Sequence, residues 1–395
     1  MIHFAALCAV GAEKVLANEL KQLGYAVSGN APGRVMYTGD EDALYRSNLW
    51  LRTADRVYLS MAVFPAPDFD ALFEGVRTLP WEDYFPKNIR VVVDKVRSFR
   101  SSLSSEHSIQ SIVHKAVYSR LGSAWRISSL PETGETAAIR VYLEKDTAHI
   151  LLDLSGMPLH RRGYRTTGGE APIRETLAAI LLQLMFWKRK TPLHDPFCGS
   201  GTIPVEAALY AYNIAPGLGR GFGIEHLAIY DRRKDEEARA KAAAEIRPDC
   251  LARITGSDID EEAIVRSKAN TERALVTAGR VLQSIGSDAK LPRPDFIRAD
   301  FAELHAPYEA GMLISNPPYG ERLGSEAEAA ELYRSMSALI SAFPGWEMGF
   351  ITSNKEFETA FGQRAEKKKE LKSGNLDTCF YQYRKRKGDS DGHHS

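Results

Sequence analysis

Two short segments of this chain combine residues whose types and spacing could do chemistry. The first runs Asp195-Pro-Phe-Cys-Gly-Ser-Gly-Thr202, an acid followed by a glycine turn at the start of a helical stretch. The second, Asn316-Pro-Pro-Tyr319, follows a short apolar stretch. Two further acids between them, Asp258 and Asp300, also end apolar stretches. Because parallel strands place their carboxyl ends at one edge of a sheet, this order predicts a site there for a nucleoside-type ligand.

The glycine turn after Asp195 predicts a site for a group that carries both an ammonium and a carboxylate. Gly199 and Gly201 allow a tight turn and a close approach of a ligand to the backbone. No lysine follows, which excludes a phosphate-binding loop, and the third glycine of a dinucleotide fingerprint is missing. Asp195 can accept a hydrogen bond from an ammonium, while N–H groups at the helix start near Thr202 suit a carboxylate. The amino-acid end of methionine fits, with Phe197 in the same loop; the alternative is an ordinary glycine turn.

The two acids between the motifs predict contacts to the rest of a nucleoside. Asp258 can accept from both hydroxyls of a ribose. Asp260 is the competing candidate, although it is also placed to cap the helix expected after it. Asp300 is the expected acceptor for an adenine amino group, with Phe301 beside the ring. The alternative for Asp300 is likewise a helix cap.

The Asn316-Pro-Pro-Tyr319 corner predicts methylation of an exocyclic amine. Such an amine is a poor nucleophile because its lone pair is delocalised into the ring. The side-chain oxygen of Asn316 and the carbonyl of Pro317 can accept its two N–H bonds and free the lone pair, while Pro318 makes the corner rigid. Tyr319 can stack on a flipped base. Alone, Asn-Pro-Pro is a turn signal; after the three acids, it predicts an S-adenosylmethionine-dependent methyltransferase.

The cysteines and histidines predict neither a metal site nor a disulfide framework. The four cysteines are scattered without a Cys-x-x-Cys pair, and the ten histidines have no metal-binding spacing. We interpret Cys198, which lies inside the glycine turn, as a packing residue and not as a nucleophile. This cysteine usage is typical of a protein in a reducing cytoplasm.

Size and composition predict a soluble globular protein of two or three domains. The chain has 395 residues, 44% hydrophobic and 26% charged. Its apolar start lacks a basic lead-in, which favours a buried strand over a signal peptide, and no apolar run is long enough to span a bilayer. The formal net charge is zero, so any RNA contact must come from local patches. The candidate patches are Arg97 with Arg100, and a connector with Arg161, Arg162 and Arg165. A single basic patch of this kind is more often a solvent-exposed face than a binding site.

The elements that position these residues change in character near residue 172. Up to residue 154 the pattern predicts an α+β region, with a helix over 106–121 and a hairpin over 138–154. Beyond 172, alternating helices and strands predict a doubly wound α/β domain with an antiparallel last strand over 378–383. The charged stretch 231–247 is predicted to be an inserted helix.

These residues resemble the THUMP-domain class I RNA methyltransferases, especially the guanine-N2 methyltransferases of large-subunit ribosomal RNA. The likeness extends over nearly the whole chain, and its signatures are residues 159–165, 171–177, 195–202 and 316–320. It implies an α/β fold with a C-terminal Rossmann-like class I methyltransferase sheet and N-terminal α+β ferredoxin-like and THUMP domains. The expected boundaries are 1–56 for the ferredoxin-like part, 57–157 for THUMP, 158–388 for the methyltransferase domain and 389–395 for a disordered tail.

The resemblance also implies roles for the site residues. Asp195, Gly199 and Gly201 would hold the methionine end of S-adenosylmethionine, Asp258 its ribose and Asp300 its adenine. Asn316 and Tyr319 would hold the target base. The expected function is methyl transfer to the exocyclic N2 of a guanosine in 23S ribosomal RNA.

Several alternatives stay open at the level of sequence. A transfer RNA guanine-N2 methyltransferase has the same architecture, whereas the longer ribosomal members carry a second methyltransferase domain that we do not expect here. Adenine N6 in DNA and a glutamine amide in protein are other acceptors for an Asn-Pro-Pro-Tyr corner. A non-catalytic RNA-binding or ribosome assembly factor is the alternative from a different class. The sequence does not predict an oligomeric state.

Overall fold

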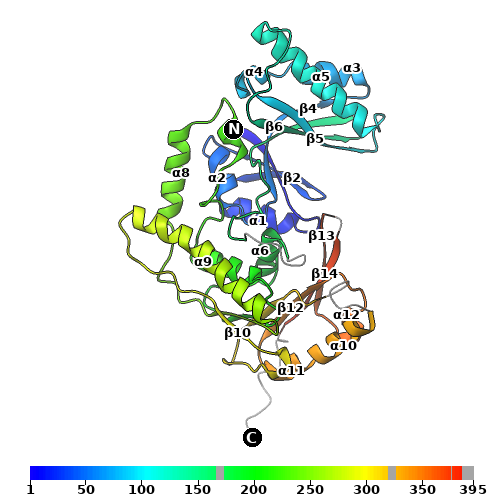
Figure 1. The fold of residues 1–395 in the computed structure, drawn as a ribbon. Helices are drawn as coiled ribbons and strands as arrows, with labels where there is room; N and C mark the ends of the chain where they lie inside the picture. Colours follow the sequence, from blue (N-terminus) through cyan, green and yellow to red (C-terminus); the bar gives the residue numbers. More distant parts are fainter. Residues whose placement is uncertain (166–172, 319–325, 375, 385–395) are drawn as a thin grey trace. The chain divides into compact units, whose positions relative to one another are not determined.

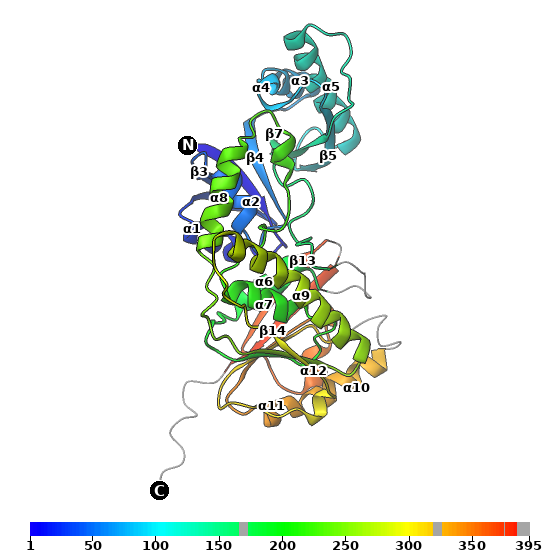
Figure 2. The same ribbon diagram turned by 60° about the vertical axis from the view of Figure 1, so that its left-hand side comes forward.

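The computed structural model describes residues 1–165, 173–318, 326–374 and 376–384. The chain divides into two compact units, which we call the N-terminal unit and the C-terminal unit (Figures 1 and 2). The N-terminal unit consists of Met1–Leu7, Ala17–Leu159 and Arg220–Arg239, and the C-terminal unit consists of Cys8–Leu16, His160–Gly219 and Ala240–Ser395.

The N-terminal unit is built on one seven-stranded sheet with the order β2-β3-β1-β4-β7-β6-β5. Its neighbouring strands are antiparallel except for β5 and β6, which are parallel. The strands are β1 (Ile2–Leu7), β2 (Ala26–Ala31), β3 (Arg34–Gly39), β4 (Arg56–Pro65), β5 (Arg90–Phe99), β6 (Thr136–Glu144) and β7 (Thr147–Asp153). The helices in the first 160 residues are α1 (Glu13–Gln22), α2 (Ala43–Trp50), α3 (Phe69–Arg77), α4 (Trp81–Tyr84) and α5 (Glu106–Trp125).

Helix α5 shows how the sequence forms these elements. Ser105 caps it by accepting a hydrogen bond from the N–H of Ser108 at 3.2 Å. Its buried positions recur at helical spacing on one face: Ile109, Val113, Ala116, Val117 and Leu121. The predicted helix over 106–121 and the predicted hairpin over 138–154 are therefore confirmed.

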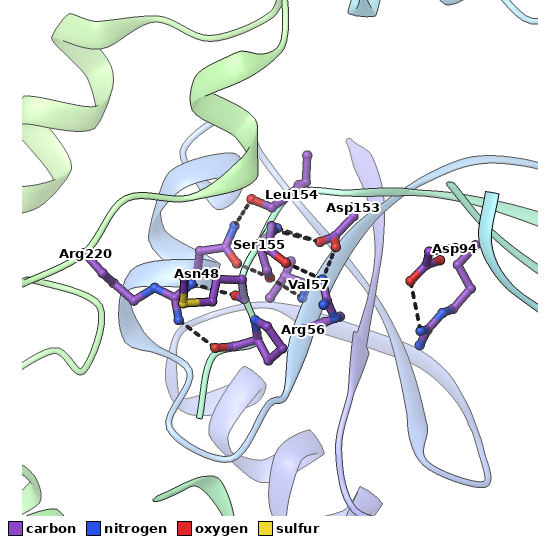
Figure 3. Close-up of polar contacts among 12 residues, drawn as sticks. Asn48, Arg56, Val57, Asp94, Asp153, Leu154, Ser155 and Arg220 are labelled. Atoms are coloured by element: carbon purple, nitrogen blue, oxygen red, sulfur yellow. Dashed lines mark hydrogen bonds and ion pairs between the residues drawn. The ribbon is translucent and has the colours of Figure 1, made fainter. Parts of the chain in front are cut away.

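A hydrogen-bond network holds the segment that follows β7, and its bonds among Asn48, Val57, Leu154 and Ser155 are buried (Figure 3). Asn48 donates to the carbonyl of Leu154 at 3.1 Å, and the hydroxyl of Ser155 donates to the side-chain oxygen of Asn48 at 2.6 Å. Ser155 in turn accepts from the N–H of Val57 at 2.8 Å. The guanidinium of Arg220 donates to two carbonyls of the same segment, at 2.6 and 2.7 Å. The network ties α2 and β4 to a segment from much later in the chain.

That later segment contains the predicted inserted helix. Helix α8 (Arg232–Ala244) occupies most of the charged stretch 231–247, which confirms the prediction. The sequence did not predict that residues up to Arg239 would belong to the N-terminal unit. The N–H of Ala228 donates to the carbonyl of Tyr84, and the N–H of Asp231 donates to the hydroxyl of Tyr45.

The C-terminal unit contains a second seven-stranded sheet, with the order β10-β9-β8-β11-β12-β14-β13. Its first five strands are parallel, and β14 and β13 are antiparallel to their neighbours, which confirms the predicted doubly wound domain and its antiparallel last strand. The strands are β8 (Leu193–Asp195), β9 (Ile254–Asp258), β10 (Asp295–Arg298), β11 (Met312–Ser315), β12 (Glu347–Thr352), β13 (Lys367–Ser373) and β14 (Leu376–Tyr383). The helices of its described part besides α8 are α6 (Glu175–Leu184), α7 (Thr202–Ala211), α9 (Glu261–Ser284), η2 (Phe301–Glu303), α10 (Glu326–Met336), α11 (Ala338–Ala342) and α12 (Phe357–Phe361). The short helix η1 (Gly223–His226) belongs to the N-terminal unit.

The strand order of the second sheet defines where a ligand can bind. Successive parallel strands run outward from β8 through β9 to β10, and then from β11 to β12 on the other side. The order therefore reverses between β8 and β11, and open α/β sheets bind ligands at the carboxyl ends of their strands beside such a reversal. None of the helices in the described part of the chain combines the length and apolar character that a bilayer span needs.

Candidate active site

A pocket of about 850 Å³ lies at the carboxyl ends of β8, β9, β10 and β11. It brings together most of the predicted site residues, namely Asp195, Phe197, Gly199, Thr202, Asp258, Asp300, Phe301, Asn316 and Pro318. Gly201 and Pro317 belong to the same loops without lining the pocket, and Tyr319 lies outside the described residues. Residues separated by more than 120 positions in the sequence thus meet around one cavity.

Asp195 is a buried acid that lines this pocket, with 2% of its surface exposed. One carboxylate oxygen accepts from the N–H of Phe197 at 3.1 Å and from the hydroxyl of Ser315. Burial raises the pKa of Asp195 to about 7, and the nearby charge of Asp258 contributes in the same direction. A cationic ligand group bound beside Asp195 would therefore favour the ionised form of this acid.

The two glycines of the turn, Gly199 and Gly201, differ in what surrounds them. Gly201 has φ 77°, and a Cβ there would lie 2.8 Å from the Cβ of Ser267, so close packing against α9 also requires glycine. Gly199 has φ 52°, yet nothing lies within 4 Å of the position that its Cβ would occupy. The backbone at Gly199 therefore leaves space toward which a ligand can approach.

Asn270 supports the same turn and was missed by the sequence analysis. It is buried on α9, and its amide donates to the carbonyl of Ser200 at 2.8 Å. Its side-chain oxygen accepts from Arg273, whose guanidinium also donates to the carbonyl of Tyr164 at 2.7 Å. A polar residue at a buried helical position was the signal that could have identified it.

The structure gives different roles to the two acids at the end of β9, Asp258, which is its last residue, and Asp260, which follows it. Asp258 accepts from the N–H of Gly199 at 2.9 Å through one oxygen and from the N–H of Asp260 at 3.0 Å through the other. Asp260 instead caps α9 by accepting from the N–H of Glu262 at 2.9 Å, and it forms an ion pair with Arg266 at 2.9 Å. Asp258 is thus the acid that joins the glycine turn to the end of β9.

Asp300 has both of the roles that the sequence allowed, as a residue of the pocket and as a helix cap. It lines the pocket, and its carboxylate also caps η2 by accepting from the N–H of Ala302 at 3.0 Å. The ring of Phe301 lies 5.0 Å from that of Phe197, and the two planes are tilted by 41°. These two half-buried rings give one wall of the pocket an aromatic surface.

The Asn-Pro-Pro corner begins directly after β11. Asn316 and Pro318 are half-buried and line the pocket, whereas Pro317 is buried. Ser315, the last residue of β11, is fully buried and donates its hydroxyl to Asp195. This hydrogen bond, which was not predicted from the sequence, links the acid that ends β8 to the residue before the corner.

Cys198 packs inside the fold. It is 6% exposed and forms a small apolar cluster with Ile264 and Phe296. Burial raises the pKa of its thiol, with further contributions from Asp195 and Asp258, which disfavours the thiolate that a nucleophile requires. Among the described residues, no group of three or more histidine, cysteine or acidic side chains could hold a metal ion.

Two arginines of the predicted RNA surface lie near the end of β5. Arg97 forms an ion pair with Glu106 at 3.0 Å, and both side chains are about half exposed. Arg100 is exposed, and its guanidinium lies 5.0 Å from the centre of the ring of Phe99, which is 60% exposed. Exposed cationic and aromatic groups of this kind can contact phosphates and unpaired bases.

The connector arginines do not all fit the predicted RNA contact. Arg161 is exposed, but the side chain of Arg162 is 3% exposed and lies 3.6 Å from Glu206. Arg165 forms an ion pair with the buried Glu175 at 2.9 Å. Because these pairs belong to the interior, we remove Arg162 and Arg165 from the candidate RNA surface and keep Arg161. The basic pattern of the connector did not distinguish an interior ion pair from a surface patch.

Three regions of the chain match known protein families. Residues 3–58 match the RlmL ferredoxin-like domain, and residues 66–153 match the THUMP domain. Residues 162–382, more than half of the chain, match the RMKL-like methyltransferase domain.

Individual relatives agree with these matches. The chain is 38% identical to a putative RNA methyltransferase, YpsC, of Bacillus subtilis, over 95% of this chain and 94% of that protein. It is 34% identical to the ribosomal RNA large subunit methyltransferase K/L of Psychromonas ingrahamii, over 97% of this chain but only 50% of that protein. Among solved structures, SMU.472, a putative methyltransferase complexed with SAH, superimposes with a TM-score of 0.84 at 35% identity, over 97% of this chain and 98% of that one.

Proposed function

Since the chain belongs to the RMKL-like methyltransferase family and joins that domain to ferredoxin-like and THUMP domains, we propose that it methylates the exocyclic N2 of a guanosine in large-subunit ribosomal RNA. The observation that carries the proposal is the single pocket shared by Asp195 and Asn316. The THUMP match and the relatives named as ribosomal RNA methyltransferases support an RNA acceptor. The chain spans about half the length of those ribosomal relatives, so their substrate comes to this chain as part of the proposal.

The pocket fits S-adenosylmethionine, the methyl donor of the family. The space beside Gly199 and the buried carboxylate of Asp195 suit the amino-acid end. Asp258 lies where a ribose can donate its hydroxyls, and Asp300 with Phe301 lies where an adenine can bind. The relative solved with SAH supports the same ligand class. When bound, this donor supplies an activated methyl group.

The residues of the corner activate the acceptor amine. The side-chain oxygen of Asn316 and the carbonyl of Pro317 accept its two N–H bonds, which favours a tetrahedral nitrogen whose lone pair points away from the ring. Both proline rings restrict the backbone, so the two acceptors keep one geometry and little reorganisation is needed at the moment of transfer. We also propose a cytoplasmic location, because all four cysteines are free, as in proteins of a reducing compartment.

Mass spectrometry of RNA from a strain that lacks this protein tests the proposed function. We expect one N2-methylguanosine to disappear from 23S ribosomal RNA and to return when the gene is supplied again. Loss from transfer RNA instead would assign the transfer RNA alternative. Unchanged RNA, together with calorimetry that detects no cofactor binding, would identify a non-catalytic RNA-binding factor.

The raised pKa of Asp195 predicts that cofactor affinity increases with pH. The ammonium end requires the carboxylate, and burial raises the pKa of Asp195 from 3.8 to about 7. Below about pH 7, binding must therefore release a proton, and affinity should fall about tenfold per pH unit. Calorimetry with S-adenosylhomocysteine between about pH 5.5 and 7.5 measures this, because the ligand ammonium stays largely charged in that range.

The matched control for the pH experiment is Asp195→Asn, which should bind weakly and without this slope. The same raised pKa affects folding in the opposite direction: its contribution to the stability of the free protein decreases as pH rises. A carboxyl whose folded pKa lies above its unfolded value stabilises the free protein below the unfolded pKa, and this contribution is lost as pH rises through about 7. A flat affinity profile for the wild-type protein would contradict the role of Asp195.

The end of β5 predicts a salt-dependent contribution to RNA binding. We expect the double variant Arg97→Ala, Arg100→Ala to bind RNA more weakly and to lower the slope of log affinity against log salt by about 2, about 1 for each lost phosphate contact. Filter binding at several salt concentrations measures the slope. The control is Arg77→Ala, another exposed arginine of the N-terminal unit that is paired with an acid, Glu74. An equal slope for both variants would remove this surface from the proposal.

A further inference from the structure

Tyr333 is a fully buried tyrosine behind the Asn-Pro-Pro corner. It belongs to α10 and has none of its surface exposed. Its ring meets that of Phe357 edge to face, with the centres 4.9 Å apart and the planes at 73°. The surrounding cluster is otherwise strongly apolar, with Phe350 and Phe361 among its members. A phenol hydroxyl buried in such a cluster costs stability unless it is hydrogen-bonded.

The hydroxyl of Tyr333 lies between two oxygen atoms. The carbonyl oxygen of Pro318 is 3.3 Å away, and the side-chain oxygen of Thr352 is 3.2 Å away. The carbonyl can only accept, so Tyr333 donates to Pro318. Thr352 accepts from the N–H of Asn354 at 3.1 Å and has its own proton left to donate to Tyr333. The bonds therefore form one directed chain, from the backbone after β12 through two hydroxyls to the corner.

The corner needs such a contact because of its prolines. A proline has no N–H, so neither Pro317 nor Pro318 can be held by donating a backbone hydrogen bond. The proline ring restricts φ, but rotation about ψ still turns the following peptide and its carbonyl. A donor on the carbonyl of Pro318 fixes that rotation. The carbonyls are thus the only backbone hydrogen-bonding groups by which these two residues can be held.

We propose that Tyr333 is a positioning residue for methyl transfer. Its hydroxyl holds the carbonyl of Pro318 and so keeps the side chain of Asn316 and the carbonyl of Pro317 in the geometry that accepts the target amine. The inference rests on the proposed function of the corner. Tyr333 is not among the described residues that line the pocket, so its effect on cofactor binding should be small.

The variant Tyr333→Phe tests the proposal, because it keeps the ring and removes only the hydroxyl. We expect kcat to fall about 10- to 100-fold, since small misplacements of catalytic groups have effects of this size. The dissociation constant of S-adenosylhomocysteine should change by less than about twofold, because the cofactor contacts are intact. Single-turnover methylation of the RNA that the wild-type protein modifies gives the rate, and calorimetry gives the affinity.

Variants at Thr352 provide a second, independent test. Thr352→Val has nearly the same shape but no hydroxyl, and we expect a smaller loss of kcat in the same direction. Thr352→Ser keeps the donor and should retain nearly wild-type turnover. Should Tyr333→Phe fold poorly, this pair alone decides the question, because equal turnover of the valine and serine variants overturns the proposal.

Tyr383→Phe is the matched control for a merely structural effect. Tyr383 belongs to the same apolar cluster, is 7% exposed, and donates its hydroxyl to the carbonyl of Gln363 at 3.3 Å. Losing it should lower the melting temperature without changing kcat. Wild-type turnover in Tyr333→Phe, or equal losses in both tyrosine variants, would overturn the positioning role. A wild-type protein that methylates no RNA would instead refute the proposed function, and the inference with it.

Discussion

Asn316→Ala is expected to remove methyl transfer while it leaves cofactor affinity nearly unchanged. In the proposed mechanism the side-chain oxygen of Asn316 accepts from the acceptor amine as its lone pair becomes available, so we expect its loss to raise the barrier to transfer without changing the free energy of cofactor binding. Removing a single preorganised group of this kind lowers kcat about 10²- to 10³-fold. Stopped-flow or quench measurement of single-turnover methylation would give the rate, and calorimetry with S-adenosylhomocysteine would give the affinity.

Asn354→Ala is the matched control for this substitution. Asn354 also follows a parallel strand of the same sheet, and its side-chain oxygen accepts from the N–H of Glu356 at 2.8 Å. The backbone N–H that it donates to Thr352 is unchanged by the substitution. We expect this variant to keep its turnover. If Asn316→Ala methylates RNA at the wild-type rate, the corner is not the catalytic element.

The second large effect is expected for Asp258→Ala, which should weaken cofactor binding about 10²-fold. The substitution removes a carboxylate that can accept from both ribose hydroxyls, and hydrogen bonds to a charged group contribute about 1.5–3 kcal/mol each. It also removes the acceptor for the N–H of Gly199, which supports the turn where we propose that the amino-acid end of the cofactor binds. Both losses act on the bound cofactor, so kcat at saturating cofactor should change far less than affinity.

Asp260→Ala distinguishes the roles of the two acids at the end of β9, Asp258 and Asp260. Because Asp260 caps α9, its loss should cost about 1 kcal/mol of stability and leave cofactor affinity close to that of the wild-type protein. Thermal unfolding and calorimetry measure the two quantities on the same sample. Unchanged affinity in Asp258→Ala, combined with weak binding in Asp260→Ala, would move the ribose contact to Asp260.

The parts of the site that could be predicted are those that depend on local pattern. An acid or amide after an apolar strand has a defined place in a parallel sheet, so Asp195, Asp258, Asp300 and Asn316 could be expected to meet at one edge. The structure places all four around one pocket. The glycines of the turn follow from local chain geometry in the same way, since their φ angles are positive. Pattern also identified the helix cap at Asp260 as a competing explanation.

The parts that could not be predicted depend on contacts between distant segments. Nothing near Ser315 or Tyr333 in the sequence indicates that their hydroxyls reach Asp195 and Pro318. Arg162 has the same local setting as a surface arginine, whereas the structure buries its side chain 3.6 Å from Glu206 of α7.

One strand near the end of the chain was also not predicted from the sequence. The sequence predicted one antiparallel strand at the end of the domain, over 378–383, whereas the structure also pairs the lysine-rich segment Lys367–Ser373 with β14 as the edge strand β13. Lysines on an edge strand protect it from pairing with other chains, which explains why a strand can have a charge pattern that does not indicate one.

A crystal structure with S-adenosylhomocysteine would show whether the pocket at β8 and β11 holds the cofactor. We predict that the ligand occupies the pocket between β8 and β11, with its ammonium at Asp195, its ribose at Asp258 and its sulfur facing the side chain of Asn316. Density for the ligand anywhere else, away from Asp195 and Asn316, would contradict the assignment of this pocket as the site of methyl transfer.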